Sequence, residues 1–69
     1  MAPAVTRYLL IDQSLEQATK GVLANCFGIT ARNTFRMQEF RVIEICVESI
    51  TLHQIAEALR SREIPFKAL

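Results

Sequence analysis

Three short segments of the chain carry apolar side chains without the spacing of a helix. They cover residues 6–12, 40–48 and 65–69. The first two are rich in β-branched and aromatic residues, which pack well on a pleated surface. Apolar segments of this length and composition are typical of strands, so we expect three strands here.

A first amphipathic segment lies between residue 14 and about residue 27. Its apolar side chains recur at spacings of three and four, which places them on one side of a helix. They are Leu15, Ala18, Val22, Leu23, Cys26 and Phe27. Ser14 and Gln17 have the spacing of a capping box at the helix start. Gly28 stands where the helix should end, because glycine adopts the left-handed conformation of a helix C-terminus.

A second amphipathic segment runs from residue 51 to about residue 62. Its apolar stripe consists of Leu52, Ile55, Ala56 and Leu59. Thr51 and Gln54 have the spacing of another capping box. The cationic side chains of Arg60 and Arg62 suit the negative C-terminal end of a helix dipole. We therefore expect a second helix over this segment.

The segment from residue 33 to residue 48 allows two interpretations. In the first, a turn at Gln38 and Glu39 separates strands over residues 34–37 and 40–48. In the second, one long helix covers the segment and the chain is all-α, with a C-terminal half like a helix-turn-helix. Dense β-branched residues are poor helix formers, so the pattern favours the two strands.

The preferred elements follow the order strand, helix, strand, strand, helix, strand. This is the order of the ferredoxin-like split βαβ fold, βαββαβ in the α+β class. We expect one domain over residues 1–69, with a four-stranded antiparallel sheet and both helices on one face. The first and third strands are then central neighbours, and the other face of the sheet is open.

Alternation along the central strands predicts what the open face carries. On the third strand, Ile43, Ile45 and Val47 point to one side and should pack under the helices. The opposite side is half apolar. We expect an uncovered patch of Tyr8, Leu10, Phe40, Val42 and Cys46. Contiguous exposed apolar patches mark interaction sites, so these five residues are the predicted partner-binding set.

Composition narrows the possible partners. The chain has 69 residues, of which 51% are hydrophobic and 22% charged, with a formal net charge of +1. Because basic and acidic residues are nearly equal in number, we expect no attraction to nucleic acid or to an anionic membrane. A small fold usually needs a staple, and with no metal motif in view we expect self-association. No export signal is visible, which predicts a cytoplasmic protein with Cys26 and Cys46 as buried, reduced thiols.

The order of elements, the Phe27-Gly28-Ile29 segment, the strand over residues 43–48 and the ending over residues 64–69 together resemble an ACT-type regulatory domain. The resemblance covers most of the chain at the level of pattern. It implies pairing of two copies and an amino acid ligand near the first strand-to-helix loop. The corresponding positions here are Asp12, Gln13 and Ser14. This loop lacks the glycine that close approach to a ligand favours.

The residue types and their spacing give little indication of a catalytic site or a metal site. His53 is the only histidine, and its spacing from Cys26 and Cys46 matches no zinc pattern. No nucleophile-and-base pair and no phosphate-binding glycine loop stands out. We expect neither catalysis, nor a cofactor, nor a metal.

Two features of the sequence are relevant to the binding of nucleic acid. Tyr8 and Phe40 could stack bases as in an RNA-recognition domain, but Glu44 and Glu48 share their face and would repel phosphate. Residues 51–59 are similar to the first half of helix-turn-helix modules. The near-zero net charge opposes DNA binding, so we expect no nucleic acid partner.

We therefore expect a non-catalytic interaction or regulatory module that acts through the open face. It would associate with itself, as a homodimer or larger species, or bind and modulate a larger protein. The alternative is an ACT-type sensor of an amino acid, and the second alternative is a nucleic-acid-binding domain.

Overall fold

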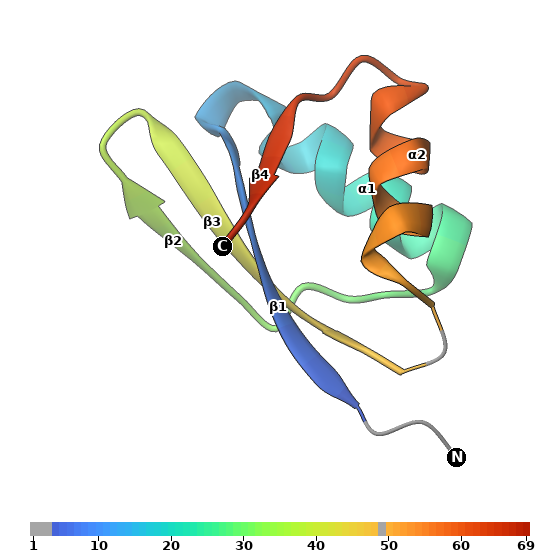
Figure 1. Cartoon of the computed structure of the whole chain (residues 1–69). Coiled ribbons are helices and arrows are strands. Elements are labelled where there is room, and N and C mark those ends of the chain that lie inside the picture. Colours follow the sequence, from blue (N-terminus) through green and yellow to red (C-terminus); the bar gives the residue numbers. More distant parts are fainter. Residues whose placement is uncertain (1–3, 49) are drawn as a thin grey trace.

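The computed structural model of the protein describes residues 4–48 and 50–69 and has two layers (Figure 1). One layer is a four-stranded antiparallel sheet in the order β2-β3-β1-β4, and the other is a pair of helices. The elements are β1 (Val5–Asp12), the 3-10 turn η1 (Gln13–Leu15), α1 (Glu16–Phe27), β2 (Asn33–Met37), β3 (Phe40–Val47), α2 (Leu52–Arg60) and β4 (Phe66–Ala68). This confirms the α+β, ferredoxin-like fold.

The middle of the chain is a β-hairpin, so the all-helical alternative is wrong. Met37 of β2 lies opposite Phe40 of β3, and the turn consists of Gln38 and Glu39. Gln38 has a φ of 59°, in the left-handed region. The Arg36 Nε donates a hydrogen bond of 2.9 Å to the backbone oxygen of Gln38, which braces the tip of the hairpin.

Helix α1 begins later than the sequence suggests, and the predicted capping box of Ser14 and Gln17 is wrong. The Asp12 carboxylate accepts hydrogen bonds from the backbone N–H of Ser14 at 2.9 Å and from its hydroxyl at 2.6 Å. The acceptor at this turn is thus the Asp12 carboxylate, two residues before Ser14. The chain forms η1 there before α1 begins. Gly28 ends α1 with a φ of 68°, as predicted.

Helix α2 begins with the predicted capping box. The Thr51 hydroxyl accepts from the Gln54 backbone N–H at 3.2 Å, and the Thr51 N–H donates to the Gln54 side-chain oxygen at 2.8 Å. The helix ends at Arg60, two residues before the predicted end, because the chain turns back at Glu63, whose φ is 57°.

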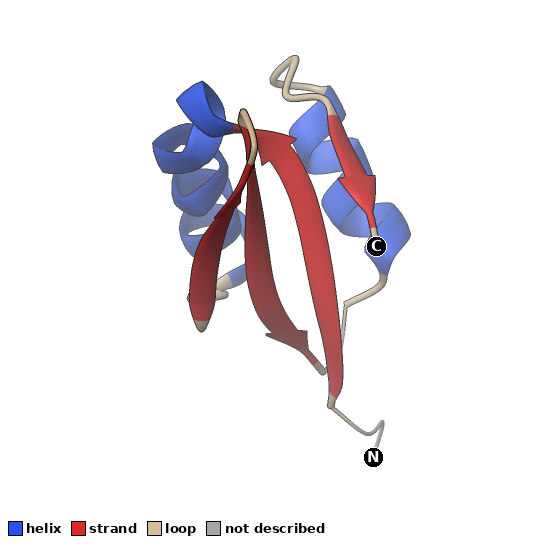
Figure 2. Ribbon diagram, turned by 90° about the vertical axis from the view of Figure 1, so that its left-hand side faces the viewer, coloured by secondary structure: helices blue, strands red, loops and turns tan. Residues whose placement is uncertain are grey.

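The core lies between the helices and one face of the sheet. It is formed by Leu9, Ile11, Val22, Leu23, Ile43, Ile45, Val47, Ile55, Leu59 and Ile64. Thr19 is fully buried beside them, and its hydroxyl donates to the backbone oxygen of Leu15 at 2.8 Å. Figure 2 views the sheet from its other side, with both helices behind the strands. That side is the face the sequence predicts to be open.

Candidate functional site

The open face is defined by the side chains that point away from the helices. Directly opposed residues of paired strands point to the same face, so the register groups them into rows across the sheet. The rows are Met37-Phe40-Asp12, Phe35-Val42-Leu10-Lys67, Asn33-Glu44-Tyr8 and Cys46-Thr6. Leu69 extends the third row, because its N–H donates to the Tyr8 backbone oxygen at 2.9 Å.

Exposed apolar side chains gather on the open face. Tyr8 is 38% exposed, Phe35 48%, Met37 52% and Leu69 58%. Val5 is the remaining exposed large hydrophobic residue of the described chain, and its register opposite Val47 turns it to the helix side. Leu10, Phe40 and Cys46 add half-buried area. Such a concentration on one face is the usual sign of an interaction surface.

Val42 does not belong to the uncovered patch in which the sequence analysis placed it. It points to the open face, as predicted, but only 1% of its surface is exposed, so it is not part of an uncovered patch. Its short side chain lies in the middle of a central strand, between Leu10 and Phe35 in the same row. The larger neighbours enclose it, so Val42 is the floor of the open face.

Phe35 and Met37 are the contact candidates that the sequence reasoning missed. Both residues have odd sequence numbers, as do the core residues of β3. Simple alternation would therefore place them on the helix side of the sheet, which is the wrong face. A two-residue turn pairs an odd position with an even one, so Phe35 lies opposite Val42. The turn predicted at Gln38 and Glu39 contained this signal.

A hollow opens beside the face at the end of β1. Its volume is about 400 Å³, and its walls are mostly apolar. It is lined by Leu10, Ile11, Asp12, Phe40, Pro65, Phe66 and Lys67. The Asp12 carboxylate and the Lys67 ammonium are its charged groups. The hollow brings together three segments that are far apart in the sequence.

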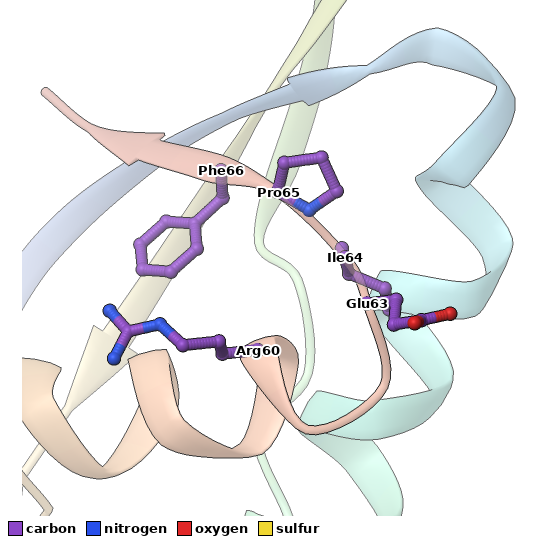
Figure 3. A pocket seen from close by; sticks show the side chains of 5 residues that line it. All are labelled: Arg60, Glu63, Ile64, Pro65 and Phe66. Carbon is purple, nitrogen blue, oxygen red and sulfur yellow. The ribbon is translucent and has the colours of Figure 1, made fainter.

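A second hollow of about 370 Å³ lies on the other side of the segment leading into β4, against the C-terminal end of α2. Figure 3 shows the Arg60 side chain reaching from α2 toward the ring of Phe66, while Glu63 points away. Ile64 and Pro65 complete its lining. This hollow faces the helix side and is separate from the open face.

The predicted ligand residues lie at the junction of β1 and α1, and all three are exposed. Ser14 donates two hydrogen bonds to the Asp12 carboxylate. The Gln13 backbone N–H donates a hydrogen bond to the Glu39 backbone oxygen at 3.2 Å. The two bonds from Ser14 lower the pKa of Asp12. One carboxylate oxygen is therefore already engaged by the local turn.

The two cysteines occupy different surroundings. Cys46 is half-buried on the open face. Cys26 is exposed on α1, so its predicted burial is wrong, and an Arg62 Nη2 lies 3.3 Å from its sulfur. His53 is 77% exposed and lies 3.2 Å from Glu57. Within residues 4–48 and 50–69, no three His, Cys, Asp or Glu side chains gather as metal ligands would.

Glu16 forms the main polar contact between the layers. Its carboxylate lies 2.9 Å from the Lys20 ammonium and 2.9 Å from the Arg41 Nε. These hydrogen bonds, from Lys20 first and from Arg41 second, lower the pKa of Glu16. Arg41 belongs to β3, so the contact fastens the start of α1 to the sheet and lies outside the open face.

Comparison of the chain with protein-family models, with curated proteins and with solved structures finds no match. None of the helices in the described part of the chain has the length and apolar character needed to cross a membrane.

Proposed function

We propose that this protein is a non-catalytic interaction module that binds protein through the open face. The observation that carries the proposal is the gathering of exposed apolar side chains on one face of the sheet. Tyr8, Phe35, Met37 and Leu69 are each between 38% and 58% exposed and all belong to that face. Burial of such side chains against a partner supplies the main driving force of association.

The arrangement of the face suits binding of protein. Aromatic residues and methionine are enriched in protein interfaces, and this face offers Tyr8, Phe35, Met37 and Phe40. Of its charged groups, Asp12 lies at one end of β1 and Lys67 on edge strand β4, while Glu44 lies beside Tyr8 on central strand β3. Apolar side chains with a few charged groups beside them are compatible with the usual composition of an interface. Binding a larger protein in this way would give the module a regulatory role.

The proposal is tested by affinity capture with the purified chain and its Phe35→Asp variant. A carboxylate at a 48%-exposed position leaves the fold intact and places a charge among the exposed apolar side chains of the face. We expect the proteins retained from cell extract, including copies of this chain, to be lost with the variant.

Val5→Asp is the matched control, because Val5 is 40% exposed on a strand but turned to the helix side. It should retain the same proteins as the parent chain. Circular dichroism establishes that both variants are folded. Equal retention by the parent chain and Phe35→Asp would contradict the proposal.

A further inference from the structure

We infer that the open face binds a second copy of this chain, face to face, about a two-fold axis that runs along the strands between β1 and β3. This inference rests on the proposed function and names its partner. The evidence is a self-complementary shape: a ridge on one side of the face and a hollow on the other.

The ridge consists of Phe35 and Met37 on edge strand β2, 48% and 52% exposed. The hollow of about 400 Å³ lies on the opposite side of the face, where Leu10 and Phe40 approach β4. A two-fold interface uses the same surface on both copies. A projection on one copy must therefore meet a depression at the position that the two-fold rotation brings opposite to it. The ridge of each copy then meets the hollow of the other.

The rows across the sheet show how the two copies meet. An axis between β1 and β3 places β2 of one copy over β4 of the other, and β3 over β1. Phe35 then lies over Lys67 of the second copy, in the row that lines the hollow. An aromatic ring and an ammonium group attract each other in this arrangement. Leu10 of each copy lies over the enclosed Val42 of the other, so no charged group stands at the centre.

Charge also permits this pairing. Under the same axis Glu44 faces Tyr8 of the second copy, whose hydroxyl can donate to the carboxylate. Asp12 faces Phe40, so none of these rows brings two like charges together. Like charges opposed across an interface cost several kcal/mol, and their absence from the rows is required for a chain to bind itself.

The face is large enough for a small interface. The four strands are 8, 5, 8 and 3 residues long, and at about 3.3 Å per residue and 4.8 Å between strands they span roughly 380 Å² before side-chain relief is added. A standard interface buries about 800 Å² on each partner, and weaker complexes bury less than about 600 Å², so this face fits an interface at the small end of the range. Coverage of roughly 380 Å² would remove about a twelfth of the 4623 Å² accessible surface of the chain.

Disulfide trapping tests the arrangement. Phe35→Cys and Lys67→Cys are introduced together after Cys26 and Cys46 are replaced by serine. Three strand spacings, about 14 Å, separate these positions within one chain, too far for a disulfide. We expect oxidation to give a covalent dimer at concentrations where a Val5→Cys/Lys67→Cys control remains monomeric.

The Phe35→Cys single variant distinguishes another arrangement. Face-to-face pairing keeps the two Phe35 positions on opposite sides of the axis, so this variant should not cross-link. Pairing of β2 with β2 at the sheet edge would bring these positions together. Rapid dimerisation of the single variant, or none of the double variant, would overturn the inference.

Light scattering on the unmodified chain provides the second measurement. We expect twice the mass of one chain, and an association constant at least about tenfold lower for Phe35→Asp than for Val5→Asp. A monomer at every concentration would overturn the inference, while affinity capture would still decide the proposed function. A dimer unaffected by Phe35→Asp would overturn the inference, and unchanged capture would then overturn the proposed function too.

Discussion

Single residues set the shape of this sheet where backbone conformation is unusual. Gln38 takes a φ of 59° at the first position of the turn between β2 and β3. A side chain in this region crowds its own backbone and costs about 1–2 kcal/mol. The chain accepts this cost because the two-residue turn brings Phe35 opposite Val42 and thus onto the open face.

Replacement of Gln38 by glycine should stabilise the protein by about 0.5–1 kcal/mol. Relief of the crowding exceeds the conformational entropy that glycine loses on folding. Urea unfolding followed by circular dichroism measures the change in the free energy of unfolding. Glu39→Gly is the control: Glu39 lies outside the left-handed region, so glycine there should destabilise. Equal effects of the two substitutions would contradict the argument.

At the scale of elements, the helices are positioned by polar contacts at their first turns. Thr51 and Gln54 form a reciprocal cap that starts α2. Helix α1 has no side-chain cap at Leu15; η1 precedes it, and Glu16 in its first turn is bonded to Arg41 of β3. The amphipathic pattern predicts both helices, but only the packed structure shows what anchors the start of α1.

The Glu16 contact should make part of the stability depend on pH. Its pKa is lowered in the folded state, by the bond from Lys20 first and that from Arg41 second. The stabilisation is therefore present above the pKa of the unfolded chain and is lost as pH falls through the folded pKa. Glu16→Gln should lower the urea midpoint at neutral pH, and the difference from the parent should vanish toward roughly pH 2.

Glu57→Gln is the control for this prediction. Glu57 is an exposed partner of His53, and exposed pairs contribute little to stability. Its midpoint should follow that of the parent chain across the acidic range. If the difference between Glu16→Gln and the parent stayed constant with pH, the carboxylate would not be the source of the effect.

At the scale of the whole molecule, the two faces of the sheet carry different kinds of apolar residue. Ile43 and Ile45 are fully buried under the helices, whereas Phe35 and Met37 stand about half-exposed on the other side. Val42 is buried without a helix above it. One face therefore holds the fold together, and the other leaves apolar side chains exposed.

Two aspartate substitutions in the same row should separate these roles. Val42→Asp places an unpaired carboxylate at a 1%-exposed site and should cost more than about 3 kcal/mol, enough to threaten the fold. Phe35→Asp, at a 48%-exposed site, should cost about 1 kcal/mol or less. Urea unfolding of both variants measures the difference. Similar losses would mean that Val42 is not enclosed as described.

The sequence by itself determined the elements and most of their ends. Length and β-branched composition predict β1 and β3, spacing predicts α1 and α2, and Gly28 marks the end of α1, because these signals depend on neighbours in the chain. It also assigned Tyr8, Leu10, Phe40 and Cys46 to the open face. These are local properties, read from a few consecutive residues.

Only the tertiary structure decided which distant residues share a row. It enclosed Val42 and brought Pro65 and Phe66 beside Leu10 to form the hollow, whereas the face of Phe35 and Met37 already follows from the two-residue turn. The physical reason is that burial and register arise between strands. A side chain's exposure depends on the size of neighbours supplied by other segments, and no periodicity within one segment contains that information.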